Sequence, residues 1–245
     1  MTWGRLAATN HRGVVVPRVL GLGLAALAVA STLLAAALGD VDAAGWGSLA
    51  GMLLVSSAGL VDDLAPPGPR GLRSHLQALA HGRVTTGIVK VVVTTGAAVV
   101  VVALQPSRAG SATLAGVVLM TASANVWNGL DVVPGRALKV FLVPATAFVV
   151  WGTVGDAPGI VGLLVGACLL LPFDLRERGM LGDSGANLVG FAAGLALYDV
   201  LPDPWVAVAA VVAVGLNVVA DTVSFSRVIG ATPPLRWVDG LGRRP

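Results

Sequence analysis

The sequence predicts an all-α fold, a polytopic membrane bundle of about eight helices, and three observations support this fold class. Hydrophobic residues make up 56% of the 245 residues and charged residues only 12%, whereas a soluble domain carries about twice that charge. The apolar residues form runs of about 14 to 25 residues, and the longer runs can cross the core of a bilayer. The basic residues, finally, are distributed unevenly between the gaps that separate these runs.

The predicted transmembrane helices follow the apolar runs in order along the chain. They span residues 14–38, 44–61, 84–104, 113–127, 138–151, 160–173, 184–197 and 204–220. If the N-terminus is cytoplasmic, the outward-facing gaps are 39–43, 105–112, 152–159 and 198–203. Only Arg108 of the sixteen Lys and Arg residues falls in these gaps, as the positive-inside rule requires. We therefore predict one transmembrane domain over 1–245, with both termini cytoplasmic and a basic tail at about 226–245.

Acidic residues gather on the predicted cytoplasmic face in four short polar stretches, of which the first is the pair Asp62 and Asp63 after span 44–61. A helix C-terminus already carries partial negative charge, so two adjacent carboxylates there need a compensating cation. Arg70 and Arg73 in the next loop, or Lys90 in the third span, would supply it, and so would Mg²⁺. The alternative is a plain ion-pair cluster that anchors the loop.

The second stretch ends span 113–127 and reads "NVWNGLD". Its polar residues Asn125, Asn128 and Asp131 are spaced by three, so they share one side of a helix end. Asparagine offers donors and an acceptor suited to a sugar, a base or a carboxylate. Arg136 follows beyond a predicted turn. Hydrogen bonding between helices is the alternative, since polar groups at membrane depth are costly unless they have partners.

The third stretch, Gly182-Asp183-Ser184-Gly185, opens span 184–197, where free backbone N–H groups favour a phosphate or a carboxylate. The alternative is that Asp183 or Ser184 simply caps the helix. The fourth stretch is Asp221 at the end of span 204–220, where an ion pair with Arg227 is the alternative. Together the four stretches suggest that carboxylates converge around a cation that holds a phosphorylated substrate. The converging residues would be Asp62, Asp63, Asp131 and Asp183.

These motifs resemble, in order and from about Asn10 to Asp221, a known enzyme family. It is the bacterial polyprenyl-phosphate N-acetylhexosamine-1-phosphate transferases, the MraY and WecA group of glycosyltransferase family 4. The similar segments are "TNHRGVVVPRVLGLGL", "GLVDDL", "NVWNGLD", "MLGDSGANLVGF" and "ADTVSFSRV". The order of several motifs is more specific than any one of them.

The resemblance implies an integral membrane enzyme that moves a sugar-1-phosphate from a UDP-sugar to a polyprenyl phosphate such as undecaprenyl phosphate. It implies Mg²⁺ as cofactor, a role in cell-envelope glycan or peptidoglycan synthesis, and a cytoplasmic active face in the bacterial inner membrane. Membrane lipids and a second copy of the chain are further expected partners, and nucleic acid is not. The implied catalytic residues are Asp62, Asp63 and Asp183, the metal ligands Asp183 and Asp63, and the substrate-binding residues Asn125, Asn128, Asp131, Lys90, Arg70 and Arg136.

The chain also departs from the family pattern. In the family, the motif that resembles "NVWNGLD", called the middle motif below, usually continues to a second Asp, and Pro134 stands at that position here. The tail also has no histidine, since the only histidines are His11, His75 and His81. A non-catalytic relative that binds lipid phosphate and assists envelope assembly is therefore the alternative function. A transporter would instead place charges near the bilayer midplane, with repeated halves, and the sequence shows neither pattern.

Overall fold

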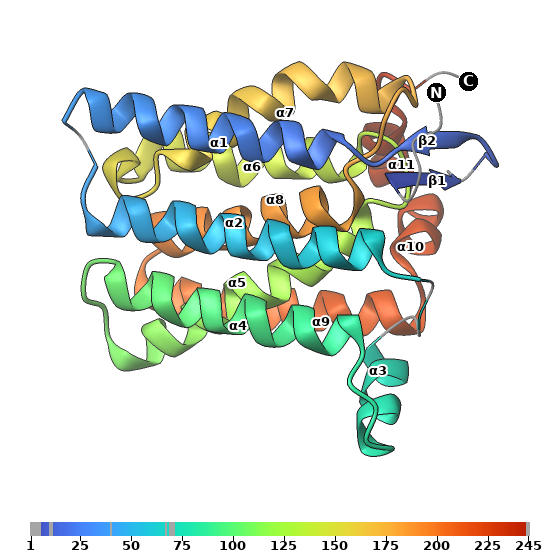
Figure 1. Cartoon of the computed structure of the whole chain (residues 1–245), viewed down its shortest axis with the longest axis horizontal. Helices are drawn as coiled ribbons and strands as arrows, with labels where there is room; N and C mark the ends of the chain where they lie inside the picture. The colour runs from blue at the N-terminus through green and yellow to red at the C-terminus, as the bar shows by residue number, and fades with distance from the viewer. Residues whose placement is uncertain (1–5, 10–11, 40, 67, 69–71, 244–245) are drawn as a thin grey trace.

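The computed structural model describes residues 6–9, 12–39, 41–66, 68 and 72–243, and this part of the chain is nearly all α-helical (Figure 1). Its long helices form a bundle of roughly antiparallel members. They are α1 (Leu20–Ala37), α2 (Ala43–Leu64), α4 (Thr86–Leu104), α5 (Gly110–Leu130), α6 (Arg136–Trp151), α7 (Gly159–Leu175), α8 (Gly182–Val200) and α9 (Asp203–Thr222). The predicted fold class is therefore confirmed in its all-α character.

Every predicted span overlaps one of these helices. By length and composition, α1, α2, α4 and α9 are long and apolar enough to cross a membrane, and α7 is apolar but shorter. The central α8 contains many Gly and Ala residues and is buried along almost its whole length, so it needs less hydropathy than the outer helices. The number of about eight spans, and the side on which the termini lie, stay predictions.

The first predicted span was wrong at its start, since α1 begins at Leu20. Residues Val15–Pro17 form strand β2, which pairs antiparallel with strand β1 (Ala7–Thr9), Val16 opposite Ala8. The carbonyl of Pro17 then accepts a hydrogen bond from the backbone N–H of Met180 at 3.0 Å. Proline fixes its own backbone and limits the residue before it to extended conformations, so the helix starts only beyond it.

Helix α8 lies at the centre of the bundle, packed against α1, α2, α5 and α6. Its glycines permit this close packing, as small residues do between membrane helices. A Cβ on Gly190 would lie 2.6 Å from the carbonyl oxygen of Ser123 in α5. A Cβ on Gly59 of α2 would lie 2.4 Å from the carbonyl oxygen of Asp183. The second approach brings the end of α2 onto the start of α8.

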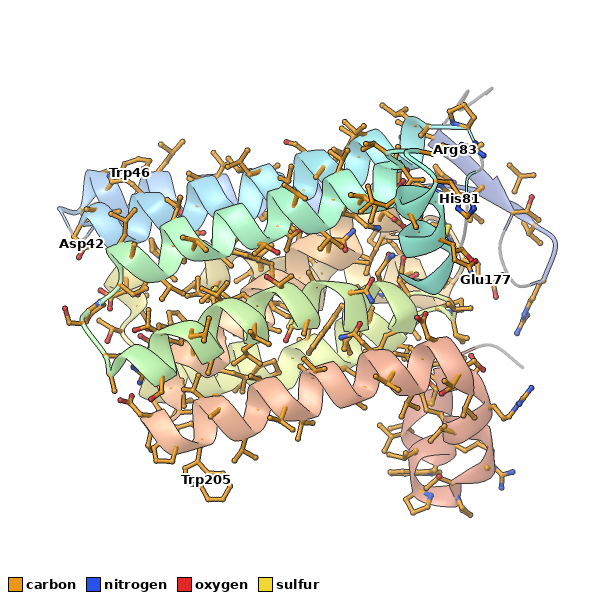
Figure 2. The ribbon with its side chains drawn as sticks, turned by 90° about the horizontal axis from the view of Figure 1, so that it is seen from below. Asp42, Trp46, His81, Arg83, Glu177 and Trp205 are labelled. Atoms are coloured by element: carbon orange, nitrogen blue, oxygen red, sulfur yellow. The ribbon has the colours of Figure 1, made fainter. Side chains whose placement is uncertain are left out.

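One end of the bundle, which we call the polar end, carries the short helices α3 (Leu72–Ala80), α10 (Phe225–Ala231) and α11 (Pro233–Gly240) and the β-hairpin (Figure 1). The opposite end carries the 3-10 turn η2 (Val154–Asp156) and the exposed side chains of Trp46 and Trp205 (Figure 2). Tryptophan is enriched where a membrane meets water. All four polar stretches lie at or near the polar end.

Candidate active site

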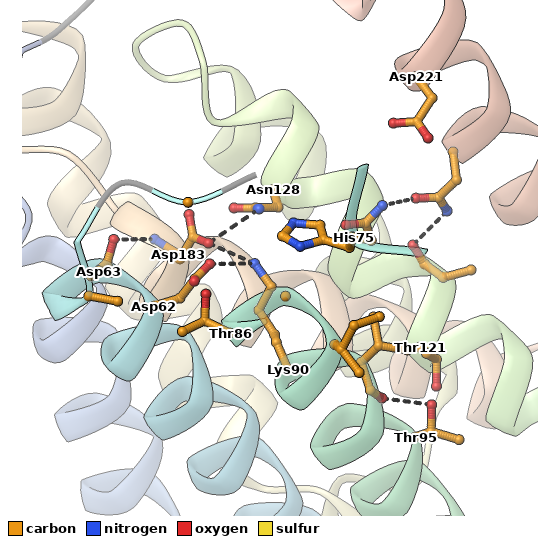
Figure 3. A pocket seen from close by; sticks show the side chains of 18 of the residues that line it. Asp62, Asp63, His75, Thr86, Lys90, Thr95, Thr121, Asn128, Asp183 and Asp221 are labelled. Atoms are coloured by element: carbon orange, nitrogen blue, oxygen red, sulfur yellow. Dashed lines mark hydrogen bonds and ion pairs between the residues drawn. The ribbon is translucent and has the colours of Figure 1, made fainter. Parts of the chain in front are cut away.

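A cavity of about 690 Å³ lies between α2, α4, α5, α8 and α9 at the polar end, with α3 beside it (Figure 3). Its lining contains both apolar and charged side chains. The apolar ones include Ile88, Val91, Val117, Val118 and Val214, and the polar or charged ones include Asp62, Asp63, Lys90, Asn128 and Asp183. The cavity therefore offers apolar surface as well as a cluster of charges.

Lys90 holds two of the predicted carboxylates together (Figure 3). Its ammonium donates to Asp183 Oδ2 at 2.7 Å and to Asp62 Oδ2 at 3.2 Å, and its side chain is only 11% exposed. Asn128 donates to the same oxygen of Asp183 at 3.4 Å. A buried ammonium needs such partners. Two carboxylates sharing one ammonium leave the cluster with a surplus negative charge.

Asp63 faces different partners from its neighbour Asp62. Its two oxygens accept hydrogen bonds from the backbone N–H groups of Asp183 and Ser184, each at 3.0 Å, and Arg18 pairs with it at 3.1 Å. The side chain is 1% exposed. A carboxylate is stabilised at a helix N-terminus, where N–H groups are free and the dipole is positive. Asp63 thus fastens the end of α2 to the start of α8.

Asp131 lies just beyond α5, in a second cavity of about 270 Å³ that Asp174 also lines. Burial, together with the negative charges of Asp174, Asp183 and Asp63, raises the pKa of the Asp131 carboxyl well above its usual range, although a backbone hydrogen bond from Gly182 opposes this. Asp131 therefore lies near the main cavity without lining it. Within the described residues, no group of three or more His, Cys, Asp or Glu side chains is arranged to hold a metal.

The three residues of the middle motif thus have three different environments. Asn125 donates a short hydrogen bond to Asn217 of α9, and Asn217 donates to the carbonyl of Ala122 at 3.0 Å. Here the alternative reading, hydrogen bonding between helices, is what the structure shows, although both amides also line the main cavity. Asn128 instead reaches Asp183.

Arg136 is held by the tail of the chain and does not line the main cavity. It donates to both oxygens of Asp239, at 2.8 and 2.9 Å, and to Ser226 at 3.0 Å. Arg243 also contacts Asp239 and donates to the carbonyl of Pro134 at 3.0 Å. Burial alone would raise the pKa of Asp239, but the hydrogen bonds from Arg136 and Arg243 outweigh it and lower that pKa to about 2. Arg70 lies outside the described residues.

Arg18 and His75 line the cavity although neither was among the predicted site residues. Arg18, which pairs with Asp63, falls inside the predicted span 14–38, and an ionisable residue inside a span marks a functional site by default. The position of Arg18 inside that span could therefore have identified it as a site residue from the sequence. His75 of α3 also lines the cavity, and the sequence offers no periodicity or motif that would single it out.

Comparison with known protein families places this site in context. The profile of the family described as Glycosyl transferase family 4 matches residues 45–200, more than half of the chain, so the chain belongs to that family. A search of curated proteins found no match. The matched region includes the Asp62, Lys90, Asn128 and Asp183 cluster and ends before α9 and the tail. Family membership, together with the apolar helices, supports a membrane sugar-phosphate transferase in general terms.

Proposed function

We propose that the chain transfers a sugar-1-phosphate from a nucleotide-sugar, a UDP-sugar by resemblance, to a polyprenyl phosphate at the cavity of about 690 Å³. The observation that carries this proposal is the pair of carboxylates from two helices, Asp62 and Asp183, that share one ammonium in a cavity that apolar side chains also line. An amphiphile with a phosphate head and a hydrocarbon tail matches a cavity lined by both charged and apolar side chains. We place the protein in the bacterial cytoplasmic membrane, with this end facing the cytoplasm.

Mg²⁺ fits the residues present. Magnesium prefers oxygen ligands and usually takes one or two carboxylates plus substrate phosphates, so the two carboxylates on Lys90 are enough. We propose that Asp183 and Asp62 hold it. The contacts favour Asp62 over the predicted ligand Asp63, because backbone N–H groups already occupy both Asp63 oxygens. Bound there, the ion would neutralise charge on the phosphates of the substrates.

In the transfer, an oxygen of the lipid phosphate bonds to the phosphorus that carries the sugar, and the bond from that phosphorus to the nucleoside monophosphate breaks. The protein's contribution is to place charges and donors, as in other phosphoryl transfers. Lys90 would bind a phosphate oxygen, and Asn128 keeps the Asp183 carboxylate oriented. Asp63 fixes the start of α8, which positions Asp183.

A non-catalytic relative that binds lipid phosphate remains the second candidate, and one observation favours it. Arg136 and Arg243 are basic residues of the middle motif and the tail, and both are engaged by Asp239. They are therefore not free to replace the missing histidines as ligands of the nucleotide phosphates.

The experiment that tests the function is transfer in lipid vesicles. Purified protein, Mg²⁺ and undecaprenyl phosphate are offered radiolabelled UDP-GlcNAc or UDP-MurNAc-pentapeptide, and label entering the lipid is counted. Asp183→Asn should lower transfer by about 100-fold or more, as loss of a group that stabilises transition-state charge does. Asp42→Asn is the matched control, since Asp42 caps α2 at the opposite end and Asn caps equally well. Lipid phosphate binding without transfer would favour the non-catalytic relative.

A further inference from the structure

His75 places an imidazole at the main cavity, a chemistry that the proposed mechanism does not use. It lies on α3, the short helix between α2 and α4, and lines the same cavity as Lys90 and Asp183 (Figure 3). The other described histidine, His81, is exposed just beyond the end of α3 and contacts the carbonyl of Gln77 in that helix. The two histidines therefore differ in their surroundings although they lie six residues apart in the sequence.

The imidazole is fixed by the first residues of α4. Its Nδ1 lies 2.8 Å from Thr85 Oγ1, and Thr85 is also the N-cap residue that accepts from Ile88. The ring lies over Gly87, where a Cβ would come within 2.5 Å of both Cε1 and Nε2. Any other residue at position 87 would push the ring away. Both contacts come from the turn that leads to Lys90.

The same turn serves the charged cluster. Thr86 lines the cavity together with Asp62, and Lys90 binds Asp62 and Asp183. Residues 85–90 therefore position the imidazole and the ammonium at one cavity. Within the described residues, Nδ1 of His75 has its partner in Thr85, whereas Nε2 has none. The charged groups that line the cavity with the ring are Arg18, Asp62, Asp63, Lys90, Asp183 and Asp221.

We propose that His75 is a substrate-binding residue whose Nε2 donates a hydrogen bond to a phosphate oxygen of the substrate held beside Lys90. The inference rests on the proposed function and extends it. Phosphate is the chemistry to expect, because the ammonium of Lys90 lines the same cavity and an imidazole N–H is a good donor to an anionic oxygen. That oxygen belongs either to the lipid phosphate or to the diphosphate of the nucleotide-sugar.

The alternative is that His75 only docks α3 on α4, and isosteric substitutions separate the two roles. His75→Asn keeps a polar group near Nδ1, where it can meet Thr85, but has nothing at the position of Nε2. His75→Gln places its amide near the position of Nε2. His81→Asn, in the turn just after the same helix, is the matched control. For each variant, KM is measured separately for undecaprenyl phosphate and for the nucleotide-sugar, together with kcat.

We expect His75→Asn to raise KM for one substrate by about tenfold, the usual effect of losing a hydrogen bond to a charged group. The substrate whose KM rises identifies the source of the phosphate. His75→Gln should restore much of the affinity, and His81→Asn should behave as the wild type. Gly87→Ala, which keeps the histidine and favours the helix, should raise the same KM by displacing the ring. If His75→Asn matches His81→Asn for both substrates, the proposal is wrong.

Failure of the proposed function would be distinguishable from failure of this inference. If the wild-type protein transfers no sugar, equilibrium binding of a short-chain polyprenyl phosphate and of inorganic pyrophosphate is compared between wild type and His75→Asn. Weaker binding of either probe by the variant supports the role of His75. Equal binding of both probes overturns it.

Discussion

Two charged clusters at the polar end have opposite arrangements of charge. In the cavity, the carboxylates of Asp62 and Asp183 share the single ammonium of Lys90. At the tail, the guanidinium groups of Arg136 and Arg243 share the single carboxylate of Asp239. The first cluster has a surplus negative charge and lines a cavity, whereas the second has a surplus positive charge and joins α6 to α11 with an Arg136 side chain only 5% exposed.

This difference indicates that the cluster around Lys90 is a binding site, whereas the cluster around Asp239 holds helices together. A cluster that is short of one cation and open to a cavity can accept a cation from solution, and the pair around Lys90 is such a cluster. In the second cluster, Arg136 donates to Asp239 and Ser226, and Arg243 donates to Asp239 and the carbonyl of Pro134, so both have less left to offer a ligand. Substitutions in the first cluster should therefore change chemistry, and those in the second should change stability.

Lys90→Gln should have the largest effect, a loss of transfer on the order of 100-fold, because Asp62 and Asp183 lose their shared cation and the substrate phosphate loses an ammonium. Vesicle transfer assays measure it. Lys139→Gln is the matched control, since the hydrogen bonds of Lys139 to described residues go to backbone carbonyls of the tail, at Val238, Asp239 and Leu241. Equal losses in the two variants would erase the distinction between the clusters.

Asp239→Asn should come next, with a loss of about 2 kcal/mol in the free energy of unfolding, because two guanidinium groups lose their charged acceptor. Thermal unfolding in detergent, followed by tryptophan fluorescence, measures it. Transfer per folded molecule should fall far less than in Lys90→Gln. A variant that is fully stable but inactive would show that the tail cluster belongs to the active site.

The pH dependence of stability sharpens the same comparison. Burial alone would raise the pKa of Asp239, but hydrogen bonds from Arg136 and Arg243 lower it to about 2. This is below the value of about 3.9 in an unfolded chain. The stabilisation is therefore complete above about pH 5 and is lost as the pH falls toward 2. The difference in melting temperature between wild type and Asp239→Asn should shrink over that window. A difference that stays constant down to pH 2 would contradict this origin.

Asn217→Leu should have the smallest effect, about 0.6 kcal/mol of destabilisation, the average for a hydrogen bond between membrane helices. The variant removes the contacts of Asn217 with Asn125 and with the carbonyl of Ala122. Unfolding in mixed detergent micelles measures the change. A loss above about 2 kcal/mol in the free energy of unfolding would mean that the Asn125–Asn217 pair stabilises the bundle more than the tail cluster does.

Sequence patterns anticipated the helices well because apolar runs of membrane length have few alternative structures. They failed at residues 14–19, where Val is apolar enough to extend a hydropathy run but favours a strand, and where Pro17 does not fit the interior of a helix. They predicted that Asp62, Asp63, Asp131 and Asp183 converge around one cation. In the structure, Asp62 and Asp183 share the ammonium of Lys90. Asp63 instead binds the start of α8, and Asp131 lines the second cavity. The sequence patterns did not reveal that Asp239 holds Arg136, because that contact joins residues 103 apart with no local pattern.

The different partners of Asp62 and Asp63 could not be predicted from the sequence. The sequence places two carboxylates at a helix end but does not show which way each one points. Successive helical residues point about 100° apart, so one carboxylate meets Lys90 in the cavity while the other meets the start of α8. Only the tertiary arrangement of α2, α4 and α8 distinguishes their roles.

The bond from Asp63 to the backbone of α8 also has a consequence for synthesis. Its N–H partners lie 120 and 121 residues later in the chain. At about 5–20 residues per second, the ribosome needs on the order of 10 s to make that stretch. During this interval Asp63 must keep its charge hydrated at the membrane boundary, or rely on Arg18, which is already made. Arg18, just before α1, would then pair with Asp63 during insertion and would keep this ion pair in the folded protein.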